Sequence, residues 1–231
     1  PYWSAFAITV VLAFMVGALL DRFVLRPVQD RPILVVVIVM VGLLLIFNSL
    51  ANWLFGPTVR TFPSPFPAQS MLGNLVSGHT FGTTAVICGL LAVIYLFFRY
   101  TPIGLDMRAA AQNPVSSRLV GIRVDRMRAL GWGLAAALGA VAGMLIAPVI
   151  FLDPNMMSGV LIYGFAAAIL GGIDNPGGAV LGGFLLGVLE NLLGAYVIGT
   201  ELKLTVALVV IVTVLLVKPA GLLGTTIVRR V

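Results

Sequence analysis

Residues 99–128, RYTPIGLDMRAAAQNPVSSRLVGIRVDRMR, interrupt a chain that is otherwise dominated by apolar segments. The whole sequence holds 14 basic residues, and six of them are arginines of this stretch. They are Arg99, Arg108, Arg118, Arg123, Arg126 and Arg128. Short loops rich in Lys and Arg stay on the cytoplasmic side of a membrane protein. We therefore expect 99–128 to be a cytoplasmic loop that fixes the orientation of the chain.

This basic loop carries the signals of a short helix. Asn113 is a good N-cap, Pro114 suits the first helical position, and Gly121 is placed to end the helix in a left-handed turn. We expect Asp125 to cap the helix that follows. A helix over 114–120 would be roughly 10 Å long and marginal in water by itself. It must therefore pack on something.

Composition predicts an integral membrane protein. Hydrophobic residues make up 60% of the chain and charged residues 10%, with a mean hydropathy of +1.12; soluble domains carry about 25% charged residues. We expect one transmembrane domain over 1–231, preceded by further helices because the chain begins at Pro1. The net charge of +6 does not indicate nucleic acid, because the arginines lie between apolar spans. The single cysteine, Cys88, lies in an apolar run, and we expect a buried packing role for it.

Seven apolar segments predict an all-α, polytopic helical bundle. Most approach the roughly 20 residues that cross ~30 Å of hydrocarbon as a helix, and the alternation of barrel strands is absent. They are 4–20, 33–55, 80–98, 129–152, 159–173, 179–199 and 202–217. The segment 159–173 is short and runs into the loop GGIDNPGG, residues 171–178, so we expect it to span only in part.

The distribution of basic residues predicts the topology. If the first segment enters from outside, twelve basic residues fall in inner loops and two, Arg60 and Lys203, in outer loops. The C-terminus is then cytoplasmic. Glycine pairs four apart, such as Gly139 with Gly143 and Gly178 with Gly182, predict close helix packing. An outer loop with four prolines, residues 56–79, either receives a soluble partner or covers the mouth of the bundle.

Few residues offer chemistry. The two lysines do not fit a phosphate-binding loop, and His79 has no second metal-ligating residue beside it, so we predict neither a catalytic nor a metal site. Glu190 is the acid that lies well within an apolar segment, where an ionisable group usually faces a cavity or the bundle interior. With Asn191, Asn48 and Asn52 it is a candidate for a substrate pathway. Hydrogen bonds between helices would explain these four residues equally well.

Several segments together resemble the permeases of branched-chain amino acid ABC importers, the LivH type. MRAAAQNPVSSRLVGIRVDRMRALGWGLAAALGAVAGML (107–145) is similar to the signature segment of that family. Similar in the same way are FAAAILGGIDNPGGAVLGGFLLGVLE (165–190), the ending KPAGLLG (218–224) and the outer loop FGPTVRTFPSPFP (55–67).

The resemblance implies an inner-membrane subunit without catalytic activity. It would pair with a second permease and with two ATPases that hold ATP and Mg²⁺, and a periplasmic binding protein would deliver the substrate. Carried over by position, the helix that couples to the ATPase comprises Asn113, Pro114, Val115, Ser116, Ser117, Arg118, Leu119, Val120 and Gly121. Two alternatives stay open: a self-sufficient secondary transporter with Glu190 as its coupling group, and an ABC permease for urea or short amides.

Overall fold

The computed structural model describes residues 2–56, 58–66, 77–173, 175–198, 203–218 and 220–224. Two compact units form, Pro1–Pro154 (unit 1) and Asn155–Val231 (unit 2), which are described separately below. Within the described ranges the regular structure is helical, as the sequence predicts, and one isolated backbone bridge joins Arg60 to Leu152.

The described residues of unit 1 form six α-helices. They are α1 (Tyr2–Leu20), α2 (Ile33–Phe55), α3 (Gly78–Tyr100), α4 (Pro102–Gln112), α5 (Pro114–Leu119) and α6 (Val124–Ile150). Two short turns of helix, η1 (Asp21–Leu25) and η2 (Arg26–Val28), extend α1. The helix α4 was not expected from the sequence; Thr101, which accepts a hydrogen bond from the Gly104 amide at 3.0 Å, caps it ahead of Pro102.

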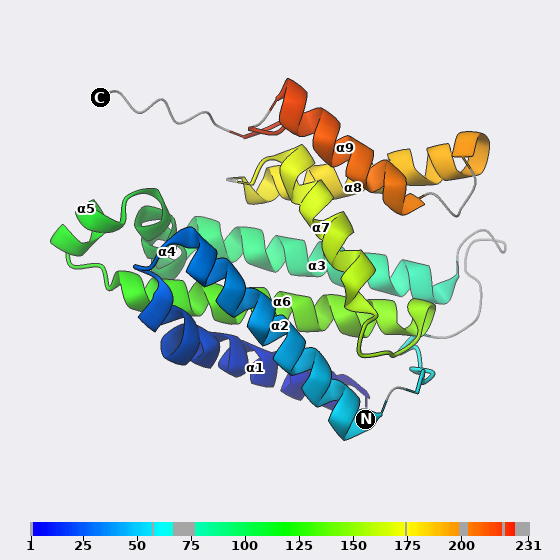
Figure 1. Cartoon of the computed structure of the whole chain (residues 1–231), viewed down its shortest axis with the longest axis horizontal. Coiled ribbons are helices and arrows are strands. Elements are labelled where there is room, and N and C mark those ends of the chain that lie inside the picture. Colours follow the sequence, from blue (N-terminus) through cyan, green and yellow to red (C-terminus); the bar gives the residue numbers. More distant parts are fainter. Residues whose placement is uncertain are drawn as a thin grey trace. The chain divides into compact units, whose positions relative to one another are not determined.

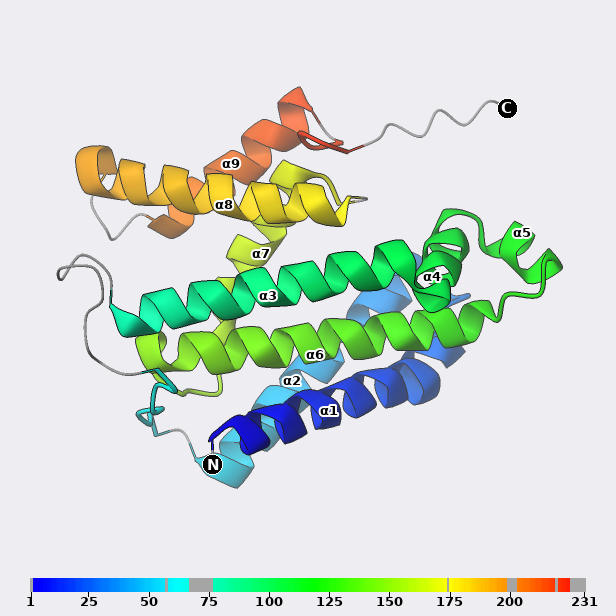
Figure 2. The same cartoon turned by 180° about the vertical axis from the view of Figure 1, so that it is seen from behind.

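The centre of unit 1 is the contact between α1 and α6 (Figures 1 and 2). The two helices run antiparallel, because early residues of α1 meet late residues of α6. Glycine allows their close approach: a Cβ on Gly17 would lie 2.6 Å from the Trp132 carbonyl oxygen, and one on Gly133 2.8 Å from Phe14. The basic loop gathers α4 and α5 at one end of this pair, and the start of α1, whose first residue is Tyr2, lies at the other (Figure 1). We call these the α5 end and the Tyr2 end.

Unit 2 consists of α7 (Met157–Gly171), α8 (Pro176–Leu193), a π-helical turn η3 (Gly194–Ile198) and α9 (Lys203–Val217). Its core contains Ala166 and Leu170 of α7, Leu186 of α8 and Ala207 of α9. The predicted close packing at Gly178 and Gly182 is confirmed, since a Cβ on Gly182 would lie 2.2 Å from the Ala167 carbonyl oxygen. A Cβ on Gly139 would meet no atom of the described residues within 4 Å, so the close packing predicted there is not found among them.

Two motifs far apart in the sequence meet in unit 2. The amides of Leu222 and Leu223 donate to the carbonyls of Leu170 and Gly171 at 2.8 and 3.0 Å. Gly172 and Gly221 lie against each other with φ of +111° and +79°, which only glycine adopts without strain. In the loop 171–178, Asn175 is the N-cap of α8, whereas Asp174 lies outside the described residues.

Five of the described helical stretches are long and apolar enough to cross a membrane. These are Tyr2–Val28, Ile33–Phe55, Gly78–Tyr100, Val124–Ile150 and Pro176–Tyr196. The helices α7 and α9 have 15 residues each, about 22 Å at 1.5 Å per residue, which is less than the ~30 Å of hydrocarbon. The short length expected of 159–173 is therefore confirmed, and 202–217 is equally short.

Exposed apolar surface agrees with a lipid environment. None of the 23 residues of α2 is buried, and large apolar side chains are exposed along α1, α3 and α8. Soluble monomers rarely expose apolar patches of such size. The expectation that Cys88 is buried is wrong: it is exposed on α3, which among the described elements packs mainly on α4.

Candidate functional site

The helix predicted over 114–120 is present as α5, residues Pro114–Leu119. The Asn113 side chain accepts a hydrogen bond from the Ser116 amide at 3.0 Å, as expected of its N-cap. At the other end Gly121 has a φ of +90°, and the Ile122 amide donates to the Ser117 carbonyl at 3.0 Å. Six residues are thus held as a helix by caps at both ends, where the sequence alone would be marginal.

One face of α5 is packed and the other is bare. Ser117 is 5% exposed, and α5 contacts α4 and α6. Val115, Leu119 and Val120 are 69%, 84% and 77% exposed. Three aliphatic side chains thus project from a helix whose opposite side is anchored. This arrangement forms an apolar knob that is suited to entering a groove on another protein.

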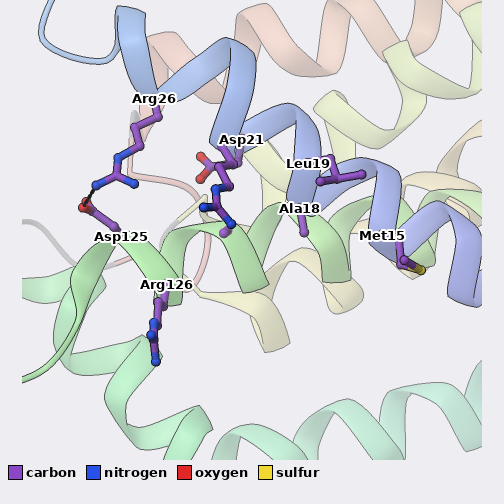
Figure 3. Close-up of a pocket in the computed structure, with 9 residues that line it drawn as sticks. Met15, Ala18, Leu19, Asp21, Arg26, Asp125 and Arg126 are labelled. Atoms are coloured by element: carbon purple, nitrogen blue, oxygen red, sulfur yellow. Dashed lines mark hydrogen bonds and ion pairs between the residues drawn. The ribbon is translucent and has the colours of Figure 1, made fainter.

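Asp125 does not cap α6. That helix begins after Arg123 without a side-chain cap, and Asp125 lies in its first turn. Its carboxylate instead accepts a hydrogen bond from Arg26 at 2.6 Å and lies 3.9 Å from an Arg118 nitrogen. Figure 3 shows Arg26 and Asp125 facing each other beside a cavity of about 420 Å³. The predicted cap is wrong because α6 starts earlier than expected, so Asp125 lies inside the helix rather than at its N-cap position.

A second ion pair lies deeper at the same end. The Arg128 Nε donates to the Asp21 carboxylate at 2.8 Å, and Asp21 is 1% exposed. The extension of α1 provides Asp21 and Arg26, and the start of α6 provides Arg128 and Asp125. The two ion pairs therefore join the end of α1 to the start of α6. Sequence reasoning missed Asp21, because it stands one residue beyond the first apolar segment. The available signal was an acid at a helix end on the side of the arginines.

The candidate pathway residues fall into both units. In unit 1 the Asn52 amide donates to the Asn48 carbonyl and side-chain oxygens at 2.9 and 3.2 Å, so the two asparagines meet one turn apart. In unit 2 Glu190 lies near Tyr163, while the Asn191 amide donates to the Gly187 carbonyl of its own helix at 2.9 Å. Each of these polar groups has a local partner, and their place on a substrate route stays a prediction.

His79 lies at the start of α3 and has a polar partner. Its Nδ1 lies 2.8 Å from the Ser64 hydroxyl, and its ring contacts Phe66. Among the residues that the structure describes, no three potential metal ligands come together. His79 therefore connects the loop 58–66 to the first turn of α3.

The geometry so far describes a multi-pass helical membrane protein with a basic, ion-paired end and a projecting helix, the class of the transport permeases. The family model for the permease component of branched-chain amino acid transport systems matches residues 1–215, and this chain belongs to that family.

Individual relatives agree with this assignment. The chain is 33% identical over 242 residues to the high-affinity branched-chain amino acid transport system permease protein LivH of Escherichia coli K12. The matched region covers 99% of this chain and 76% of the relative. The chain is 30% identical to BraD of Pseudomonas aeruginosa over the same shares. A xylose/arabinose import permease, XylH of Sulfolobus acidocaldarius, is 32% identical over 63% of this chain and 40% of its own length. No solved structure matches.

Proposed function

We propose that this chain is a membrane-spanning subunit of an ATP-driven importer of branched-chain amino acids in the bacterial inner membrane, with its C-terminus in the cytoplasm. It would act with a second permease subunit, two ATPase subunits that bind ATP and Mg²⁺, and a periplasmic binding protein. It has no enzymatic activity of its own in this proposal. The family membership and the names of the relatives LivH and BraD support it.

The observation that carries the ATPase coupling is the exposed knob of α5. Val115 and Leu119 project from a helix that is capped at both ends and anchored through Ser117. A groove on an ATPase that closes on this knob would bury about three aliphatic side chains, each worth roughly 1.5–3 kcal/mol when fully buried. This burial would favour docking of a separate subunit on the knob.

Transport would follow from movement of α5. Binding of ATP brings the two ATPases together, and α5 moves with the groove that holds it. Arg118 at the end of α5 lies beside Asp125, and Asp125 holds Arg26. Movement of α5 therefore reaches α6 and the end of α1 together, and the bundle alternates between outward and inward exposure. Glu190, Asn191, Asn48 and Asn52 are the candidates for the polar route.

Uptake in proteoliposomes tests this function. The two permeases and the ATPases are purified together and reconstituted, the binding protein is supplied outside, and radiolabelled leucine is followed. We expect ATP-dependent uptake of leucine, isoleucine or valine. Uptake of a sugar, urea or a short amide in preference would assign another substrate class, and uptake by this chain without ATPases would assign a secondary transporter.

A single substitution on α5 tests the proposed coupling to the ATPase. Leu119→Asp places a charge on the knob, and desolvating an unpaired carboxylate costs several kcal/mol. We expect uptake to fall at least about tenfold, with loss of either ATPase binding or ATP-driven transport. Leu105→Asp, which changes an exposed leucine of α4, is the matched control and should transport normally. Normal uptake by Leu119→Asp would contradict the role of α5.

A further inference from the structure

A second cavity lies at the Tyr2 end of unit 1, far from the basic loop. It has a volume of about 670 Å³, within the 300–1,000 Å³ that is usual for small-molecule sites. Its wall comes from the start of α1, the last turn of α2, the loop 58–66, the later part of α6 and the turn after it. Most of the wall is apolar and includes Ala5, Phe6, Phe55, Phe62 and Met144.

Two residues of opposite charge line this cavity, Arg60 and Asp153. The backbone holds both at its edge, because Arg60 and Leu152 exchange two hydrogen bonds, at 3.0 and 2.8 Å, and Asp153 follows Leu152. The Arg60 side chain is itself fixed: its Nη2 donates to the Phe55 carbonyl at 2.9 Å. A guanidinium has five N–H donors, so others remain for a ligand.

A third polar group points to a missing partner. Tyr2 lines the same cavity, and its hydroxyl is buried and has no hydrogen-bond partner among the described residues. A buried hydroxyl left in this way costs free energy, roughly 1–3 kcal/mol, and calls for an explanation such as a ligand that is absent. The cavity thus combines a cation and an anion with an aliphatic and aromatic wall, and the unpartnered hydroxyl belongs to one of its lining residues, Tyr2.

This set of groups selects one ligand chemistry. A free amino acid carries a carboxylate and an ammonium on one carbon, and an aliphatic side chain beyond them. A sugar would need many hydrogen-bond partners that the apolar wall does not offer, and urea or a short amide has no charge for either Arg60 or Asp153 to bind.

We propose that this cavity is the entry site of the permease for the amino acid, with Arg60 binding the carboxylate, Asp153 the ammonium, and the wall around Phe6 and Met144 the aliphatic side chain. This inference rests on the proposed function. The sequence left two interpretations of the proline-rich outer loop open: it receives a soluble partner, or it covers the mouth of the bundle. The proposed entry site favours the second interpretation for residues 58–66.

The location fits delivery from outside. The cavity lies at the start of α1, whereas the basic loop lies at the other end of the antiparallel α1–α6 pair. A 27-residue helix such as α6 is about 40 Å long, enough to separate the two faces of a bilayer. With the basic loop in the cytoplasm, the cavity opens to the compartment from which an importer receives its substrate.

Direct binding tests the site without the binding protein. The permease–ATPase complex is placed in nanodiscs, and tritiated leucine binding is measured by scintillation proximity. Arg60→Gln removes a charge-assisted contact and should weaken leucine binding by about tenfold to a hundredfold, with partial recovery in Arg60→Lys. Asp153→Asn should weaken it similarly. Arg22→Gln, which removes an exposed arginine at the α5 end, is the matched control and should bind normally.

Two analogues sharpen the assignment. Leucinamide lacks the carboxylate, so its weaker binding should change little in Arg60→Gln but fall further in Asp153→Asn. The reverse holds for 4-methylpentanoate, which lacks the ammonium. A merely structural role for either residue would reduce all three ligands together.

The outcomes separate this site from the proposed function. If the unaltered complex takes up leucine and both variants bind and transport it normally, the entry site is wrong and the function stands. If the unaltered complex takes up no branched-chain amino acid in the reconstituted assay, the function itself fails. Equal loss of all ligands in both variants, with an intact complex by gel filtration, would also overturn the assigned roles.

Discussion

At the residue scale, the two ion pairs at the α5 end differ in burial, and burial decides what each contributes. The Asp21 side chain is 2% exposed in its pair with Arg128, whereas Arg26 and Asp125 are 50% and 37% exposed. Removing one partner of a buried pair leaves an uncompensated charge and costs about 3–5 kcal/mol. An exposed pair contributes about 0–1 kcal/mol.

We therefore expect Asp21→Asn to destabilise the protein by about 1.5–3 kcal/mol, because the buried Asp21 side chain loses its charge-assisted hydrogen bond with the half-buried Arg128. The thermal unfolding midpoint of the purified complex in detergent measures this. Asp30→Asn, at an exposed position of the loop after η2, should leave the midpoint unchanged. Equal midpoints for both variants would mean that Asp21 is not a structural anchor.

Asp125→Asn should behave differently. Stability should change by no more than about 1 kcal/mol, since the pair with Arg26 is exposed. The ratio of ATP hydrolysed to leucine transported should rise severalfold, because Asp125 links Arg118 to Arg26. The exchanged pair Arg26→Asp with Asp125→Arg should restore part of the ratio. A normal ratio in the single variant would exclude Asp125 from coupling.

At the element scale, the sequence predicted helices better than it predicted their contacts. Caps are local, so Asn113, Pro114 and Gly121 identified α5 correctly. The contact of α1 with α6 depends on which faces meet, and nothing in one sequence indicated that Gly17 and Gly133 would come together rather than Gly139. Asp125 shows the same limit, since its partner Arg26 lies 99 residues away. The ion pairs at the α5 end and the pair of charges that line the cavity, Arg60 and Asp153, were not predicted, because the members of each pair are distant in sequence.

Two glycines of α8 provide a matched test of helix packing. A Cβ on Gly182 would lie 2.2 Å from the Ala167 carbonyl oxygen, whereas one on Gly187 meets nothing within 4 Å. Gly182→Ala should destabilise by about 1–3 kcal/mol through overpacking. Gly187→Ala should stabilise by about 0.5–1 kcal/mol, because alanine is the better helix former. The thermal midpoints should move in opposite directions, and a parallel change would contradict the α7–α8 contact.

At the scale of the whole molecule, orientation is the property on which the proposed roles of both ends depend. Ser116 at the α5 end and Thr58 at the Tyr2 end are both exposed. Single cysteines at these positions, in a Cys88→Ala background, can be labelled with a membrane-impermeant maleimide. In intact cells, Thr58→Cys should react and Ser116→Cys should not. Inverted vesicles should reverse the result, and labelling of Ser116→Cys in intact cells would refute the topology.

The antiparallel pair of α1 and α6 has a mechanical consequence. The contacts of Gly17 and Gly133 and the two salt links all lie toward the α5 end of the pair. They resist sliding of one helix past the other, so we expect the pair to respond to a push by tilting as one unit. The knob and the cavity lie at opposite ends of that unit. In the proposed transport cycle, a force applied to the knob would therefore tilt the pair, and this tilt would open or close the wall of the cavity at the opposite end.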